Sequence, residues 1–391
     1  MCAVSVNVLL ATVLILWLLV ASISCFGVYR AQRDRPLPLV PHKQVAIIMP
    51  MRGVPAHFDQ MWHGICAQSY NSFRIIFAVE SAADPAYAAL PRLESGPPIE
   101  ITVAGPTTKR AQKIHNVLAA LRSLKDGDRY VVFADADIVP DRDWLRRLMK
   151  WADGECDVAS GYRWMVPSDH RWATAFACVI NSSLATAARV PFLAVAWGGS
   201  MAMGRTAIEA LELEQVWDRS VSDDLTLTRR VWARGGRVRS ARDVLVPSLV
   251  SYTWKDAIAF GRRQYLLMRI HMPWHWALFA ATTTLPVAGW AVALPLAMRG
   301  SVGAIAVIVA ANVLDQIRAY FRRRLPRKLW NTPMSGRVAF LDQWGTPIWL
   351  MVNAITIWST LFGHRITWAG RSYTVNHRGQ VLQIEAQECG R

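Results

Sequence analysis

The segment YVVFADADIVP, residues 130–140, ends a run of apolar residues with two acidic ones, Asp135 and Asp137. Carboxylates this close to each other repel unless a positive charge lies between them. A divalent cation bound to a phosphate would supply that charge, because Mg²⁺ and Mn²⁺ prefer carboxylate and phosphate oxygens as ligands. A polar loop that leaves a buried strand would also explain the two residues, so this short motif alone is a weak signal.

Segments typical of strands and of helices alternate on both sides of this motif. The strand-like segments are apolar and cover residues 45–53, 73–81, 99–105, 128–137, 157–165, 195–204 and 236–248. The helix-like segments cover residues 56–69, 109–124, 171–188, 222–236 and 254–272. This alternation predicts an α/β fold with a mostly parallel sheet and helices on both of its faces. Ligands of such sheets bind at the carboxyl ends of the strands, where Asp135 and Asp137 are expected to lie.

Long apolar segments predict an integral membrane protein. Of the 391 residues, 53% are hydrophobic, and residues 6–25 are uncharged and long enough to span a bilayer. A cleaved signal peptide is a weaker explanation, because the positive region that normally starts one is missing. Arg30, Arg33 and Arg35 follow, and by the positive-inside rule they place the next domain in the cytosol.

The C-terminal part contains three further apolar segments. Residues 274–298 and 302 to about 315 predict a helical hairpin whose second arm is short for a span, and residues 344–363 form the last segment. Basic residues follow both the hairpin and the last segment, so the side of the membrane on which the tail lies stays open. The expected organisation is an anchor at 1–29, a linker at 30–43, an α/β domain at 44–272, a membrane or interfacial region at 273–363 and a basic tail at 364–391.

The net charge of +16 is compatible with three kinds of partner: nucleic acid, an anionic membrane surface or an anionic substrate. No nucleic-acid-binding motif occurs in the sequence, and arginines cluster beside the apolar segments. We therefore expect no nucleic-acid partner. The non-enzymatic alternative is a basic protein that binds the membrane surface without catalysing a reaction.

Two acidic motifs lie where a ligand could bind. SDD (222–224) begins a predicted helix, so Asp223 and Asp224 could stabilise the helix dipole, or one of them could act as a general base. VESAADPA (79–86) puts Glu80 and Asp84 after a predicted strand, in a composition that is also typical of a surface turn.

Two basic motifs could bind phosphate. Lys113 lies near the start of the helix predicted at 109–124, where phosphate can bind, although a solvated basic face is the more usual explanation. Arg262 and Arg263 in GRRQY (261–265) could pair with a diphosphate or lie on anionic lipid.

The order of these motifs resembles the ceramide glucosyltransferase family, a membrane-bound relative of the family-2 glycosyltransferases with the GT-A fold. The matching stretches, in chain order, are VES-AADPA, K-IHNVL, the DAD strand, WGGSMAM, SDD, SYTWKDAIAFGRRQYLLMRIHM and ITWAGRSYTV. The resemblance covers nearly the whole chain. It implies an α/β GT-A (Rossmann-like) domain with transmembrane helices at both ends, a nucleotide-sugar donor, and Mg²⁺ or Mn²⁺ as cofactor.

The resemblance also implies roles for individual residues. Asp135 and Asp137 look like the metal and donor-diphosphate site, and Asp224 looks like the catalytic base. The remaining candidates are Glu80, Asp84, Lys113, Arg262 and Arg263 on the donor side and Asp223, Gln264 and Tyr265 on the acceptor side.

Two motifs depart from the family pattern. Ser81 stands at the position of the family's first aspartate, flanked by Glu80 and Asp84, so the contact to the nucleotide base differs. The (Q/R)xxRW motif is missing, since GRRQY has Gln264 and Tyr265 where Arg and Trp are expected. Contacts to the leaving group are therefore expected from Arg262 or Arg263.

The combined pattern predicts a membrane-bound inverting glycosyltransferase that moves a hexose from a UDP-sugar to the hydroxyl of a membrane lipid such as ceramide. We expect a multi-pass protein of the bacterial inner membrane with its catalytic domain in the cytoplasm. Glycosylation of a hopanoid or of a polyprenyl phosphate remains an alternative. A processive polysaccharide synthase is less favoured, because the membrane region is small for a polymer channel.

Overall fold

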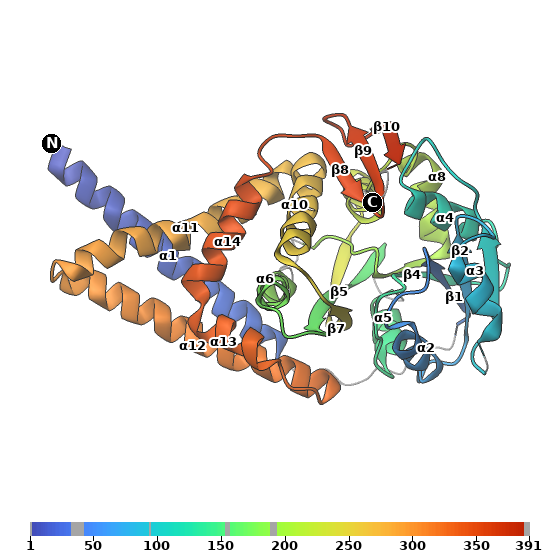
Figure 1. The fold of residues 1–391 in the computed structure, drawn as a ribbon, viewed down its shortest axis with the longest axis horizontal. Coiled ribbons are helices and arrows are strands. Elements are labelled where there is room, and N and C mark those ends of the chain that lie inside the picture. Colours follow the sequence, from blue (N-terminus) through green and yellow to red (C-terminus); the bar gives the residue numbers. More distant parts are fainter. Residues whose placement is uncertain (1, 33–42, 94, 153–156, 188–193, 387–391) are drawn as a thin grey trace.

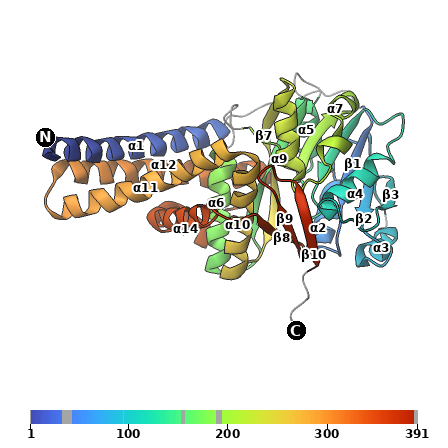
Figure 2. The ribbon, with the colours of Figure 1, turned by 90° about the horizontal axis from the view of Figure 1, so that it is seen from above.

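The structure is a computed structural model that describes residues 2–32, 43–93, 95–152, 157–187 and 194–386. An α/β unit lies beside a bundle of long helices that extends from one of its sides (Figure 1). Seen from above, helices α1 (Cys2–Ala31), α11 (Pro273–Met298) and α12 (Val302–Trp330) run together away from this unit (Figure 2).

Seven strands form the central sheet, in the order β3-β2-β1-β4-β6-β5-β7. Strand β6 is antiparallel to β4 and β5, and the other neighbours pair in parallel. The prediction of a mostly parallel sheet is therefore confirmed. The strands are β1 (Val45–Pro50), β2 (Phe73–Val79), β3 (Ile99–Val103), β4 (Tyr130–Ala134), β5 (Val158–Pro167), β6 (Ser200–Gly204) and β7 (Val238–Val250).

Helices cover both faces of this sheet. Along β4, Val131 and Phe133 face one apolar core and Val132 and Ala134 face the other, as the two-residue period of a strand requires. Helices α4 (Gln112–Leu121) and α9 (Asp223–Ala233) pack on the first face, and α2 (Phe58–Cys66) and α5 (Trp144–Ala152) pack on the second. The other helices of this part are α3 (Pro85–Ala89), η1 (Leu90–Arg92), α6 (Trp172–Ala187), α7 (Arg205–Leu211), α8 (Leu213–Val216) and α10 (Trp254–His271).

Three helices are long and apolar enough to cross a membrane: Val8–Ala31 of α1, α11 and α12, with 24, 26 and 29 residues. They pack closely where Trp17 of α1 lies on Gly289 and Trp290 of α11, with ring centroids of the two tryptophans 5.2 Å apart. A Cβ on Gly289 would lie 2.5 Å from the Trp17 ring, so this glycine allows the close approach.

Helix α12 corrects the prediction that the second arm of the hairpin ends near Asp315, because it continues to Trp330. The charged residues that suggested an end are paired inside the protein. Arg318 contacts Asp315 in the same helix, and Arg322 donates a 2.5 Å hydrogen bond to Asp342 in α13 (Gly336–Trp344). Paired in this way, the charges are compatible with a buried continuation of the helix.

The last apolar segment, expected at 344–363, forms the short helix α14 (Thr346–Trp358). Its 13 residues are fewer than the about 20 that a spanning helix needs. It packs beside α10 and α11 and returns the chain to the α/β unit. By length and composition, the C-terminal region therefore contains two candidate spans within the part that the structure describes.

The expected basic tail is largely a three-stranded antiparallel sheet of β8 (Arg365–Trp368), β9 (Arg371–Val375) and β10 (Val381–Ala386). Its apolar side chains explain this difference, because Ile366, Tyr373 and Val381 are buried in the same core as α4. Residues 387–391 of the tail and 33–42 of the linker lie outside the described residues, and Arg30 and Ala31 belong to α1.

Candidate functional site

Two pairs of acidic residues meet beyond the carboxyl ends of the strands. Asp135 and Asp137 directly follow β4, and Asp223 and Asp224 form the first turn of α9. Ser222 caps that helix by accepting a hydrogen bond from the backbone N–H of Leu225, as its N-cap position predicts. The sheet order reverses between β1 and β4, which is where ligands of such sheets bind.

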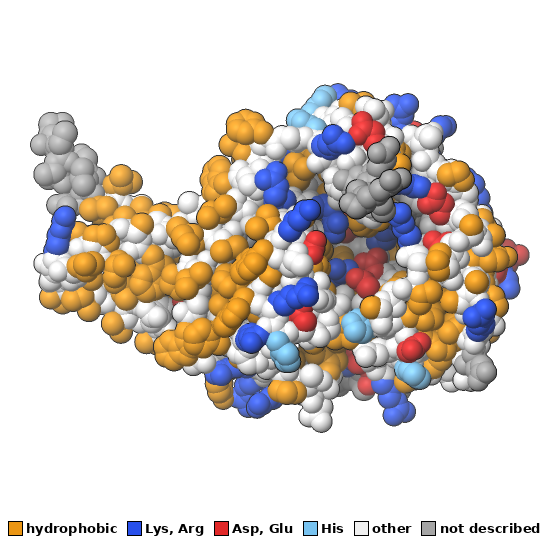
Figure 3. All heavy atoms as spheres, viewed as in Figure 1, with side chains coloured by type: hydrophobic (Ala, Val, Ile, Leu, Met, Phe, Trp, Pro, Cys, Tyr) orange, Lys and Arg blue, Asp and Glu red, His pale blue; other side chains and the backbone are white. Residues whose placement is uncertain are grey.

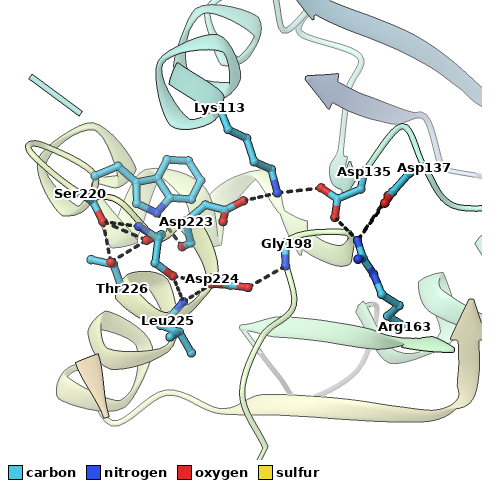
Figure 4. Close-up of polar contacts among 12 residues, drawn as sticks. Lys113, Asp135, Asp137, Arg163, Gly198, Ser220, Asp223, Asp224, Leu225 and Thr226 are labelled. Atoms are coloured by element: carbon cyan, nitrogen blue, oxygen red, sulfur yellow. Dashed lines mark hydrogen bonds and ion pairs between the residues drawn. The ribbon is translucent and has the colours of Figure 1, made fainter. Parts of the chain in front are cut away.

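Lys113 connects the two acidic pairs (Figure 4). Its Nζ lies 2.7 Å from Asp135 Oδ1 and 2.9 Å from Asp223 Oδ2. Burial alone would lower the pKa of Lys113, but attraction to Asp135 and Asp223 outweighs it and raises the pKa. Burial likewise opposes ionisation of Asp135, and attraction to Lys113 and Arg163 outweighs it and lowers the pKa of that carboxyl.

Arg163 of β5 lies between the two aspartates of the DAD motif. Its Nη2 is 3.3 Å from Asp135 Oδ2 and 3.2 Å from Asp137 Oδ2, and the guanidinium also lies 5.4 Å from the centre of the Trp197 ring. The positive charge expected between these carboxylates is thus supplied in this structure by the chain itself. Sequence reasoning missed Arg163, although a charged residue within an otherwise apolar strand is a signal that could have revealed it.

Asp224 lies on the other side of Asp223 and is held by three hydrogen bonds. Its Oδ1 accepts from Ser222 Oγ at 2.6 Å and from the backbone N–H of Leu225 at 2.7 Å, and its Oδ2 accepts a long bond from Gly198 N at 3.4 Å. Burial, and next the nearby charge of Asp223, raise the pKa of Asp224 to about 6. A carboxyl group with such a pKa can accept a proton near neutral pH.

Two glycines in the WGGS segment leave room for these carboxylates. A Cβ on Gly198 would lie 2.3 Å from Asp223 Oδ2, and one on Gly199 would lie 2.5 Å from Asp135 Oδ2. The backbone therefore approaches both acidic pairs more closely than a residue with a side chain would allow. These glycines stood in a segment quoted for the family resemblance, but the sequence analysis assigned them no role.

The four candidate residues of the GRRQY segment lie in different surroundings in the structure. Arg263 lies near Arg163, and its guanidinium stacks 5.7 Å from the centre of the Trp368 ring in β8. Burial lowers the pKa of Arg263. Arg262 and Gln264 are exposed, and Tyr265 is buried against the membrane helices, where its hydroxyl donates to Asn353 Oδ1 at 2.6 Å. Of these four residues, Arg263 is the one beside the acidic cluster.

The two donor candidates after β2 have protein partners. Asp84 caps α3, since its Oδ1 accepts from the backbone N–H groups of Gly53 at 2.8 Å and Ala86 at 2.9 Å. Glu80 Oε1 accepts a 2.6 Å hydrogen bond from Arg371 in β9. Asp84 therefore has a structural explanation, and Glu80 belongs to a contact with the C-terminal sheet that the sequence analysis did not foresee.

Asp135 and Asp137 are suitable ligands for Mg²⁺ or Mn²⁺. The Asp137 side chain is 45% exposed, and each carboxylate oxygen has two lone pairs, so coordination directions remain beside the Arg163 contact. Within the described residues, no group of three or more acidic, His or Cys side chains is placed to hold an ion. The two carboxylates of Asp135 and Asp137 therefore fit a hard cation that takes its remaining ligands from phosphate and water.

A hollow on the face of the α/β unit shown in Figure 3 contains acidic and basic side chains side by side. Hydrophobic side chains cover much of the helical extension in the same view (Figure 3). The polar site thus belongs to the α/β unit, beside an apolar extension.

The sequence profile of glycosyl transferase family 21 matches residues 7–381 of this chain. The chain belongs to glycosyl transferase family 21. No curated protein sequence matches it. Its sheet and flanking membrane-type helices confirm the predicted α/β fold class, a GT-A domain with apolar helices at both ends.

Several solved structures are similar to this glycosyltransferase at low identity. Mannosyltransferase PcManGT from Pyrobaculum calidifontis, in complex with GDP-Man and Mn²⁺, shares 18% identity with a TM-score of 0.48, over 83% of this chain and 99% of that chain. S. aureus TarS 1–349, in complex with UDP-GlcNAc, shares 12% identity with a TM-score of 0.39, over 88% of this chain and 100% of that chain. Family membership rests on the match over residues 7–381.

We predict that Gly199→Ala disturbs the acidic cluster of this family 21 enzyme. Its methyl group would lie 2.5 Å from Asp135 Oδ2 and 2.2 Å from the Trp197 ring, and such overpacking costs about 1–3 kcal/mol. The expected results are a lower melting temperature and weaker nucleotide binding, measured by thermal unfolding and calorimetry. Gly204→Ala, at the far end of the strand that follows Gly199, is the control, because the atoms nearest to its Cβ would lie 3.8 Å away. Identical behaviour of the two variants would contradict the prediction.

Proposed function

We propose that this glycosyltransferase moves a hexose, such as glucose, from a UDP-sugar to the hydroxyl group of a membrane lipid such as ceramide. The acceptor oxygen attacks the anomeric carbon as the nucleoside diphosphate leaves. One displacement of this kind inverts the anomeric configuration. The observation that carries the proposal is the position of Asp224, a buried carboxyl with a pKa raised to about 6, beside a cluster suited to a diphosphate.

In this proposal, Asp135 and Asp137 would hold a divalent cation, which would supply positive charge to the donor diphosphate. Mg²⁺ or Mn²⁺ bound there would neutralise the charge that develops on the leaving group. Lys113 keeps Asp135 ionised and oriented, because its Nζ contacts Asp135 Oδ1 at 2.7 Å. Arg263, stacked on Trp368, adds a further positive charge near the site besides Lys113 and Arg163.

Asp224 is the proposed general base. Its Oδ1 is occupied by the short bonds from Ser222 and Leu225, which fix the carboxylate plane. Its Oδ2 accepts one long bond from Gly198 N, so this oxygen is the better placed one to accept the hydroxyl proton of the acceptor. Asp223 forms an ion pair with Lys113, and its negative charge contributes to the raised pKa of Asp224.

A cavity of about 290 Å³ supports a lipid acceptor. It lies between the α/β unit and the membrane region, and Val139 and Pro140, which closely follow Asp137, form part of its wall. Most of the other lining side chains are apolar and come from β5, α6, β7, the end of α12, the loop after it and the start of α13. They include Trp164, Met165, Cys178, Leu249, Trp330, Met334 and Val338. An apolar space at this boundary suits a hydrocarbon chain better than a sugar polymer.

We place the protein in a bacterial inner membrane as part of this proposal, and the arrangement of its candidate spans supports a cytoplasmic site. If α1, α11 and α12 each cross once, the α/β unit and the C-terminal sheet lie on the same side, and the sheet does pack on that unit. The arginines at the end of α12, such as Arg323 and Arg327, lie toward that side and satisfy the positive-inside rule.

We predict that Asp224→Asn abolishes transfer while nucleotide binding is retained. The amide has nearly the same shape but cannot accept the hydroxyl proton, and general bases contribute about 10²–10⁴-fold to rates. Single-turnover transfer and UDP affinity would be measured on the same preparation. Asp126→Asn, which removes an exposed carboxylate in the turn between α4 and β4, is the control. An Asp224→Asn enzyme with normal turnover would remove Asp224 from the mechanism.

We also predict an acid limb in the pH dependence of transfer. Because the pKa of Asp224 is raised to about 6, its carboxylate is the major form above that pH and the inactive acid is the major form below it. The rate should fall about tenfold for each pH unit below about 6. A rate that stays constant down to pH 4.5, with the protein folded, would exclude Asp224 as the base.

A further inference from the structure

The C-terminal sheet is part of the α/β unit, although the chain enters it from membrane-region helix α14. Ile366, Tyr373, Val375 and Val381 are buried in the core that also contains Ile114 of α4. An isolated bridge between Ser220 and Gln380 connects it to the loop before α9. The sheet therefore has a fixed position beside the site.

The β8–β9 hairpin turns at Ala369 and Gly370, whose φ angles are 50° and 69°. Two positive φ angles are typical of the tight turn that suits a twisted hairpin. The turn lies against the segment after β1, since a Cβ on Gly370 would be 3.3 Å from Arg52 Nη2. The tip of the hairpin thus lies near the carboxyl end of β1, where the sheet order reverses between β1 and β4.

Arg371, directly after this turn, ties three elements together. Its Nη2 donates to Glu80 Oε1 at 2.6 Å, after β2, and its Nη1 donates to Gln112 Oε1 at 2.7 Å, at the start of α4. Gln112 Nε2 in turn donates to the carbonyl of Gly105, after β3, at 2.8 Å. Arg371 therefore orients Glu80 from a segment almost 300 residues later in the chain.

Trp368, on the other side of the turn, connects the hairpin to the phosphate side of the site. The Lys113 ammonium lies 6.0 Å and the Arg263 guanidinium 5.7 Å from the centre of its ring. Such distances are typical of cation–π contacts. The hairpin thus contacts residues next to Asp135 and residues next to Glu80.

We propose that the β8–β9 hairpin completes the donor site and that Arg371 and Glu80 together read the nucleoside base. This inference rests on the proposed use of a nucleotide sugar. Strand β1 separates β2 from β4, so Glu80 and Asp135 leave the sheet about 10 Å apart, the separation expected for two strand spacings. A nucleotide whose diphosphate lies at Asp135 can then place its base near Glu80.

The Arg371–Glu80 pair has the chemistry to recognise a base edge. The Arg371 guanidinium has five N–H donors, of which some are used by Glu80, Gln112 and the Tyr373 hydroxyl, so donors remain for a ligand. Glu80 Oε2 accepts no hydrogen bond from the described residues. A donor beside an acceptor complements uracil, which presents a carbonyl beside an N–H. The side chains are 20% and 25% exposed, so a ligand can reach them.

The test compares Arg371→Ala and Arg371→Lys with Arg365→Ala in the full-length protein. Arg365 is the matched control, because it lies in the adjacent strand, is 64% exposed and pairs with Glu385 at the surface. Calorimetric titrations in detergent with Mg²⁺ would use UDP, GDP and inorganic pyrophosphate as probes. Pyrophosphate reports the phosphate side without a base, and the melting temperature reports folding.

We expect Arg371→Ala to weaken UDP binding roughly tenfold to a hundredfold, the range for lost hydrogen bonds to charged groups, while pyrophosphate binding is unchanged. GDP binding should weaken as well, because guanine also presents a carbonyl beside an N–H. Arg371→Lys keeps the charge but not the two-nitrogen fork, so it should also weaken UDP binding, and Arg365→Ala should match the wild type.

Three results would overturn the inference. Unchanged UDP affinity in Arg371→Ala would show that the hairpin does not read the base. Equal losses for UDP and pyrophosphate would assign Arg371 to the phosphate side or to general stability. The first two results would leave the proposed function intact. A wild-type protein that binds neither UDP nor GDP would reject the proposed function together with the inference.

Discussion

Lys113 lies between Asp135 and Asp223, with its Nζ within 3 Å of both carboxylates, and balances their charges in a largely buried space. Without a cation there, the acidic residues after β4 and at the start of α9 would repel each other and take up protons. The same contact orders the site. It keeps Asp135 ionised. Asp224, the residue after Asp223, has no direct contact to Lys113 within the described residues and is the carboxyl with a raised pKa. In the proposed mechanism, the contacts of Lys113 thus separate Asp135, which would bind the charged donor, from Asp224, which would accept the proton.

The fold brings these groups together from distant parts of the chain. Strand β4, helix α4 and helix α9 supply the charged side chains, and the WGGS segment supplies the space, since Gly198 and Gly199 face Asp223 and Asp135 without side chains. The membrane helices then place an apolar cavity directly behind the DAD segment, where Val139 and Pro140 line it. In the proposed function, one short loop therefore contributes both to the donor site and to the apolar space for the lipid acceptor.

The sequence alone predicted the parts of this site that lie in short motifs. Asp135, Asp137, Asp223, Asp224 and Lys113 were singled out from local patterns that are weak alone and were given roles by the family resemblance, and the structure brings them together. The alternating strands and helices likewise predicted the sheet. Local patterns work here because a strand end and a helix start leave signals in adjacent residues.

Contacts between distant segments leave no signal that names both partners, although the charge of Arg163 within an apolar strand marks one of them. Arg163 was missed because its pairing with Asp137 requires β5 to lie near β4 across β6. The contact from Arg371 to Glu80 was missed for the same reason, since it depends on a sheet that follows the membrane helices. The end of α12 was misplaced at Asp315 because only the folded chain shows that its charges are paired. Long-range pairing, and not local propensity, decides these features.

The central claim, transfer of a sugar to a membrane lipid, is tested most directly by incubating the purified protein with Mg²⁺ or Mn²⁺, radiolabelled nucleotide sugars and a total membrane lipid extract. The lipids are then separated by chromatography. The account predicts one new labelled lipid with a UDP-hexose as donor, absent from the Asp135→Ala enzyme, and its identity would distinguish ceramide from a hopanoid or a polyprenyl phosphate. A ladder of products, or no labelled lipid from any donor, would contradict it.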